Sequence, residues 1–91
     1  MAIARHLIAT GRVQGVGFRQ YMMHTARELG ITGWVRNRAD GSVEAVIAGA
    51  PESVDRMIER AQRGPAHAAV TELRVSEADG TFERFELRPT V

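Results

Sequence analysis

The spacing of apolar residues changes from one period to another along the chain. Ile3 to Thr10 is rich in strand formers, whereas the apolar positions recur at helical spacing from Phe18 onward. That spacing predicts a helix over Phe18–Leu29. Gly30 stands where a helix cap belongs, and Ile31 supplies the hydrophobic contact that usually follows such a cap. The chain is therefore expected to open with a strand and a helix.

Two further stretches, Gly33 to Arg38 and Ser42 to Ala48, carry strand-forming residues. Ala39-Asp40-Gly41 between them is typical of a hairpin turn. This pattern predicts two neighbouring antiparallel strands joined as a hairpin.

A second helix is predicted over Glu52–Gln62. Pro51 stands in the first turn, where proline is best tolerated, and Gly64-Pro65 ends the helix. Val70 to Val75 and Phe82 to Leu87 are the last predicted strands.

The predicted order of elements is β-α-β-β-α-β plus a short extra C-terminal strand. This order indicates an α+β fold, the ferredoxin-like split β-α-β sandwich, with two helices on one face of an antiparallel sheet. The 91 residues are expected to form a single domain, residues 1–91. Because one helix separates the first two strands, these strands run in the same direction. Their C-terminal ends therefore meet at one edge of the sheet.

Composition excludes several classes of function. The chain is 44% hydrophobic and 25% charged with a formal net charge of +1, as in an ordinary soluble globular protein. It has no Cys, which excludes disulfides, thiolate catalysis and Cys-ligated metals. No apolar run is long enough to span a membrane, and the N-terminus does not resemble a signal peptide. We expect a cytoplasmic monomer with no membrane partner.

The loop Gly11–Arg19 joins the first strand to the first helix and has the features of an anion site. Gly15 and Gly17 let backbone N–H groups converge, and the following helix adds its unpaired N–H groups. Arg19 can hold two oxygens of a phosphate. The spacing is not a dinucleotide fingerprint, because Gln20 replaces the third glycine, and without Lys it is not a P-loop.

Two segments resemble the signature motifs of the acylphosphatase family. The first is the loop Gly11–Arg19, and the second is Gly33-Trp34-Val35-Arg36-Asn37, followed by Asp40-Gly41-Ser42-Val43-Glu44. The resemblance extends over essentially the whole chain. It implies the ferredoxin-like fold derived above and an enzyme that hydrolyses acyl phosphates without a metal or other cofactor.

The resemblance also implies a role for particular residues. Arg19 corresponds to the family's phosphate-binding arginine, and Asn37 to the asparagine that orients the attacking water. Arg38 departs from the family, since many relatives have Thr or Ser after that asparagine. Backbone N–H groups complete the phosphate site, from Gln14, Gly15, Val16, Gly17 and Phe18. The implied ligands are an acyl phosphate substrate and inorganic phosphate or sulfate as a competing ligand.

Other functions are less well supported by the residues. His6, His24 and His67 are too scattered to indicate a metal site. A nucleic-acid-binding module of this fold would need aromatic residues on the first and third strands, which have none, so no nucleic-acid partner is expected. A regulatory phosphate-binding domain of the same fold is a third reading. The initial Met and the end just after the last strand favour a complete protein instead.

Overall fold

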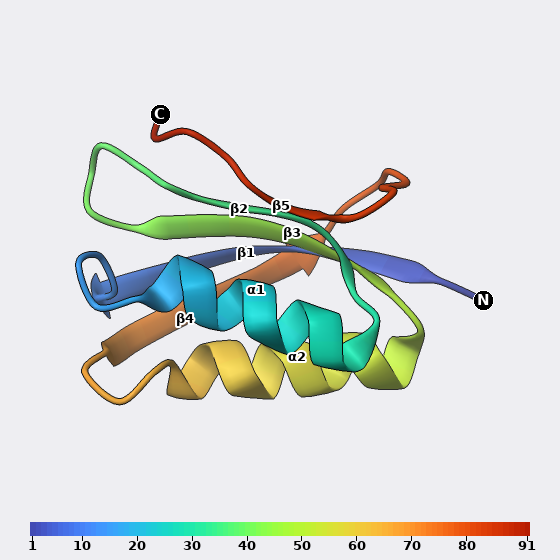
Figure 1. The fold of residues 1–91 in the computed structure, drawn as a ribbon, viewed down its shortest axis with the longest axis horizontal. Helices are drawn as coiled ribbons and strands as arrows, with labels where there is room; N and C mark the ends of the chain where they lie inside the picture. Colours follow the sequence, from blue (N-terminus) through green and yellow to red (C-terminus); the bar gives the residue numbers. More distant parts are fainter.

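A computed structural model describes residues 1–91, and its elements follow the predicted order (Figure 1). The elements along the chain are β1 Ile3–Arg12, α1 Phe18–Leu29, β2 Thr32–Asn37, β3 Val43–Gly49, α2 Pro51–Arg63, β4 Ala69–Glu77 and β5 Phe85–Leu87. The prediction for the first helix is correct at both ends.

The five strands form one sheet in the order β4-β1-β3-β2-β5. Both β1 and β2 pair antiparallel with β3, so β1 and β2 run in the same direction, as predicted. The two helices lie side by side on one face of this sheet (Figure 1). The ferredoxin-like α+β sandwich expected from the sequence is therefore confirmed.

One detail of the predicted sheet is wrong, because the last strand is not antiparallel to its neighbour. β5 pairs parallel with β2, with Val35 opposite Leu87, so the sheet is mixed. β4 and β5 consequently lie on opposite edges of the sheet. The physical reason is apolar burial: at the β2 edge, α1 covers β5, and Phe85 is buried in the common core.

The helices divide the sheet between them. α1 contacts β2 and β5, whereas α2 contacts β1, β3 and β4. Burial of their apolar sides against the sheet is the main stabilising contribution expected for a chain of this size. The core cluster comprises Leu7, Ala9, Val13, Phe18, Met22, Ala26, Ile31, Val35, Val43, Ala45, Ile47, Val54, Met57, Ala61 and Phe85.

Local signals at the two ends of α1 fix its length. Gly17 precedes the helix and Gly30 follows it, both in the left-handed conformation. The N–H groups of Gly30 and Ile31 both donate to the carbonyl of Ala26, which closes the C-terminal end. The N-terminal end has no side-chain cap, so its N–H groups stay open. Neither α1 nor α2 is long and apolar enough to cross a membrane.

Candidate active site

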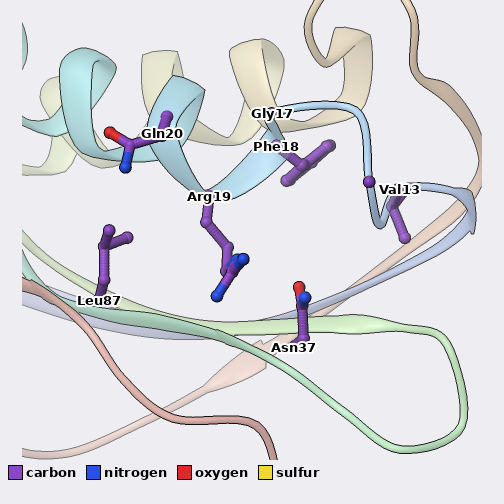
Figure 2. A pocket seen from close by; sticks show the side chains of 8 residues that line it. Val13, Gly17, Phe18, Arg19, Gln20, Asn37 and Leu87 are labelled. Atoms are coloured by element: carbon purple, nitrogen blue, oxygen red, sulfur yellow. The ribbon is translucent and has the colours of Figure 1, made fainter.

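The C-terminal ends of β1 and β2 meet beside the N-terminus of α1 and enclose a small cavity (Figure 2). Its volume is about 150 Å³. The residues that line it are Val13, Gly15, Gly17, Phe18, Arg19, Gln20, Asn37 and Leu87. The cavity therefore combines the glycine loop, the first turn of α1 and the β2–β5 edge of the sheet.

The loop before α1, which lines this cavity, contains backbone donors without a partner in the protein. Gly15 and Gly17 have φ angles of 72° and 80°, a backbone conformation that residues with a Cβ rarely adopt. None of the N–H groups from Gln14 to Gln20 donates to a backbone carbonyl. No acidic residue occupies the first turn of α1. This loop is therefore suited to binding an anion through its backbone.

Arg19 and Asn37 face each other across the cavity. Arg19 extends from the first turn of α1 toward the sheet, and the Asn37 side chain rises from the last residue of β2 (Figure 2). Neither side chain makes a hydrogen bond within the protein, and Arg19 has no acidic partner. Both polar groups are consequently free to bind a ligand.

The backbone of Asn37 is held on both sides. It pairs with Val43 of β3, and its carbonyl accepts a 3.2 Å hydrogen bond from the N–H of Val91. The N–H of Ala39 in turn donates to the carbonyl of Val91 at 2.6 Å. Residues 88–91 thus continue along the edge of β2 and hold the backbone of Asn37 on the side away from β3.

The hairpin after Asn37 is closed by Asp40. Its carboxylate accepts hydrogen bonds from the hydroxyl of Ser42 at 2.6 Å and from the N–H of Ser42 at 2.9 Å. These bonds, led by the hydroxyl, hold the pKa of Asp40 below its ordinary value of 3.8. Asp40 is therefore a structural residue of the turn, and its carboxylate is already occupied.

Known acylphosphatases match both the sequence and the geometry. The Acylphosphatase family profile matches residues 5–87. An acylphosphatase from Albidiferax ferrireducens is 48% identical over 86 residues, 94% of each chain. The chain belongs to the acylphosphatase family. This membership confirms the class of enzyme expected from the sequence, an acylphosphatase.

Solved acylphosphatase structures share the fold closely. The structure from Coxiella burnetii has a TM-score of 0.92 at 35% identity and covers 96% of this chain and 93% of that one. The structure from Bacillus subtilis has a TM-score of 0.90 at 33% identity, covering 97% and 99%. Nearly the whole of this acylphosphatase chain therefore follows a known arrangement.

Most residues expected at the site line the cavity, and two do not. Gly15, Gly17, Phe18, Arg19 and Asn37 line it. Gln14 turns its side chain away to the β2–β3 hairpin, and Val16 packs against the hydrophobic core. For these two residues only the backbone N–H is left as a candidate contact to an anion.

Sequence reasoning missed three of the residues that line the cavity: Val13, Gln20 and Leu87. Val13 lies within the loop Gly11–Arg19 and Gln20 directly follows it, so both could have been included from their position in the chain. Leu87 could not, because it reaches the cavity only through the parallel pairing of β5 with β2.

The sheet face opposite the helices carries a polar network away from the cavity. The Glu44 carboxylate is 2.7 Å from Nε2 of His6 and accepts a 2.8 Å hydrogen bond from Nε of Arg36. Partial burial raises the pKa of Glu44, but the bonds to His6 and Arg36 outweigh it and the net shift is downward. Trp34 beside them is 8% exposed and contacts the guanidinium groups of Arg36 and Arg88. Its ring is therefore occupied by cation–π contacts.

No group of three or more His, Asp and Glu side chains is close enough together to hold a metal ion. The charged side chain that reaches the cavity is Arg19. The site can therefore offer a ligand one cation, several backbone N–H groups and the carboxamides of Asn37 and Gln20.

Proposed function

We propose that this chain hydrolyses the carboxyl–phosphate bond of acyl phosphates by direct attack of water on a phosphoryl group bound by Arg19. Asn37 orients the water. The observation that carries this proposal is that two side chains without internal partners line one cavity beside a loop of unpaired N–H groups. Family membership supports the reaction class.

The phosphoryl group would bind at the N-terminus of α1. Its oxygens accept hydrogen bonds from loop N–H groups and a two-pronged contact from the Arg19 guanidinium. Positive charge then faces the three peripheral oxygens, where negative charge is spread in the loose transition state of phosphoryl transfer. The half-buried position of Arg19 strengthens this interaction relative to open water.

The water would be held by the Asn37 carboxamide opposite the bond that breaks. Its oxygen forms the new bond to phosphorus while the bond between phosphorus and the acyl oxygen breaks. The electron pair of that bond stays on the leaving carboxylate, which is stable as an anion. No general acid is therefore required, and the water's proton leaves with the phosphate product or to solvent.

The proposed reaction needs no metal, since Arg19 and the loop supply the positive charge. We also propose that the chain acts as a monomer in the cytoplasm. Light scattering of the purified protein tests the first of these two statements, and fractionation of the source cells tests the second.

Release of inorganic phosphate from benzoyl phosphate tests the proposal. The expected result is enzymatic turnover that inorganic phosphate and sulfate inhibit competitively, because they occupy the Arg19 site. Arg27→Ala serves as the control, because Arg27 is an exposed arginine in the last turn of the same helix. Turnover that is absent in the folded protein, or that is unaffected by Arg19→Ala, would refute the proposal.

A further inference from the structure

The side chain of Gln14 connects the two halves of the active site. Its Nε2 donates to the carbonyl of Arg38 at 2.8 Å and to the carbonyl of Ser42 at 2.9 Å. Both partners are acceptors, so the amide nitrogen must face them, which fixes the orientation of the carboxamide. One side chain of the glycine loop thus spans to both ends of the β2–β3 turn.

The two carbonyls that Gln14 reaches also close the hairpin. The carbonyl of Ser42 accepts the N–H of Arg38, and the carbonyl of Arg38 accepts the N–H of Gly41. Arg38 directly follows Asn37 in the chain. A shift of the hairpin relative to the loop would therefore move Asn37 relative to the bound phosphoryl group.

We propose that Gln14 is a positioning residue that sets the distance between the phosphate-binding loop and Asn37. This inference rests on the proposed function, because it acts through the water held by Asn37. In-line attack tolerates little misplacement, and an error of about 1 Å in a reacting group can cost up to about 100-fold in rate. Gln14 itself need not touch the substrate.

Gln14→Met tests the role, because it keeps the length of the side chain and removes both donors. We expect kcat on benzoyl phosphate to fall about tenfold, while the inhibition constant for inorganic phosphate changes less than twofold. Gln62→Met is the matched control, since Gln62 is an exposed glutamine on α2 away from the cavity. If Gln14→Met does not fold, Gln14→Asn provides the same test with an amide one methylene too short.

A double-mutant cycle separates positioning from simple stability. If Gln14 acts through Asn37, then Gln14→Met should lower kcat in the wild type but have no further effect in an Asn37→Ala background. A tenfold fall in both backgrounds would overturn the inference, as would a lower melting temperature with unchanged kcat. Absence of turnover in the wild type would refute the proposed function instead, so the two failures are distinguishable.

A second inference comes from Leu87, which forms the wall of the cavity beyond Arg19. Leu87 is 38% exposed and pairs with Val35 on the helix-covered face of the sheet. In Figure 2, Leu87 and Asn37 lie on opposite sides of the Arg19 side chain. In-line displacement requires the water and the leaving carboxylate to lie on opposite sides of phosphorus. A water at Asn37 therefore directs the acyl group toward Leu87.

We infer that Leu87 forms a subsite for apolar acyl groups, an inference that also rests on the proposed function. Arg19, the charged side chain that lines the cavity, is engaged by the phosphoryl group. Gln20, which lines the same side of the cavity, is neutral. An aliphatic or aromatic acyl group gains apolar contact with Leu87. An acyl group that carries a second anionic group has no further cationic side chain in the cavity lining to pair with.

The ratio of kcat/KM for benzoyl phosphate to that for acetyl phosphate tests this subsite. Leu87→Ala should lower the ratio about three- to tenfold, as for loss of one or two buried methylene contacts, because kcat/KM falls more for benzoyl phosphate than for acetyl phosphate. Val75→Ala, an exposed apolar residue on the opposite edge strand β4, is the control. An unchanged ratio, or an equal fall for both substrates, would refute the subsite; turnover of neither substrate by the wild type would refute the proposed function.

Discussion

Arg19 and Asn37 reach the same cavity from opposite layers of the protein, one from the first turn of α1 and the other from the last residue of β2. Neither depends on the other for a hydrogen bond. Their contributions can therefore be separated by mutation. The proposed roles require different kinetic consequences when each is removed.

Removal of the Arg19 guanidinium should affect both binding and turnover. Arg19→Ala is expected to raise KM and to lower kcat severely, since the phosphoryl group is contacted in the ground state and in the transition state. Arg19→Lys should also have a raised KM and a lowered kcat, because an ammonium group cannot make the planar two-pronged contact. Steady-state kinetics on benzoyl phosphate measure both effects, and a lysine variant with wild-type kinetics would contradict the assigned contact.

Removal of the Asn37 carboxamide should affect turnover alone. Asn37→Ala is expected to leave the inhibition constant for phosphate nearly unchanged and to lower kcat by roughly 100- to 1,000-fold, as for loss of one aligned polar group. Circular dichroism should show a folded variant, because the Asn37 side chain makes no internal hydrogen bond. Near-normal turnover would mean that Asn37 does not position the water.

Gly17 and Gly30 form a matched pair at the two ends of α1. Both have left-handed backbones, with φ of 80° and 68°, and a Cβ added to either meets no atom within 4 Å. Substitution of either glycine by alanine should therefore lower the free energy of unfolding by a similar amount, about 1–2 kcal/mol. Only Gly17→Ala should also weaken phosphate binding, since Gly17 lines the cavity. Equal phosphate affinity in the two variants would argue against an anion site at this loop.

The lowered pKa of Glu44 predicts a loss of stability in acid. The pKa of the Glu44 carboxylate is lower in the folded than in the unfolded state. Such a group stabilises the fold at pH values above its ordinary pKa, here 4.5. That contribution is lost as pH falls through the folded-state pKa. Glu44→Gln should cost about 1.5 kcal/mol at pH 7 and make denaturant unfolding less dependent on pH below 4.5.

The control for this prediction is Glu72→Gln. Glu72 lies 3.5 Å from Arg74 on the exposed edge strand, where both side chains are more than half exposed to solvent. Such a surface pair contributes little. The two variants should therefore differ in acid, and identical pH profiles would mean that the bonds to His6 and Arg36 do not stabilise the fold.

Activity should survive exhaustive chelation. The proposed reaction draws its positive charge from Arg19 and the backbone of the loop, so treatment with EDTA should leave kcat on benzoyl phosphate unchanged. A loss of turnover that a divalent cation restores would contradict the proposed chemistry.

Features that depend on neighbouring residues could be predicted from the sequence. The glycines at the ends of α1 mark its limits, and the hairpin turn and Pro51 mark the elements after it. The sequence could place Arg19 and Asn37 close together, because β1 and β2 end at the same edge of the sheet. Arg19 follows β1, and Asn37 is the last residue of β2. These predictions needed only local conformational preferences and simple rules of chain connection.

Features that depend on pairing across the fold could not be predicted. The parallel partner of β5 is chosen by burial of Phe85 under α1, and no local signal at Phe85 specifies a direction. The hydrogen bonds of Gln14 go to main-chain carbonyls of Arg38 and Ser42, which any residue at those positions would supply. The side chain's direction was therefore visible only in three dimensions.

β5 is short and pairs with a single neighbour at the outer edge of the sheet. It brings Leu87 to the cavity, whereas the other residues that line it lie between Val13 and Asn37. The proposed phosphoryl site and the proposed acyl subsite are then encoded by separate pieces of the chain. An engineer could diversify position 87 to seek new acyl preferences while the residues proposed to act on the phosphoryl group stay untouched.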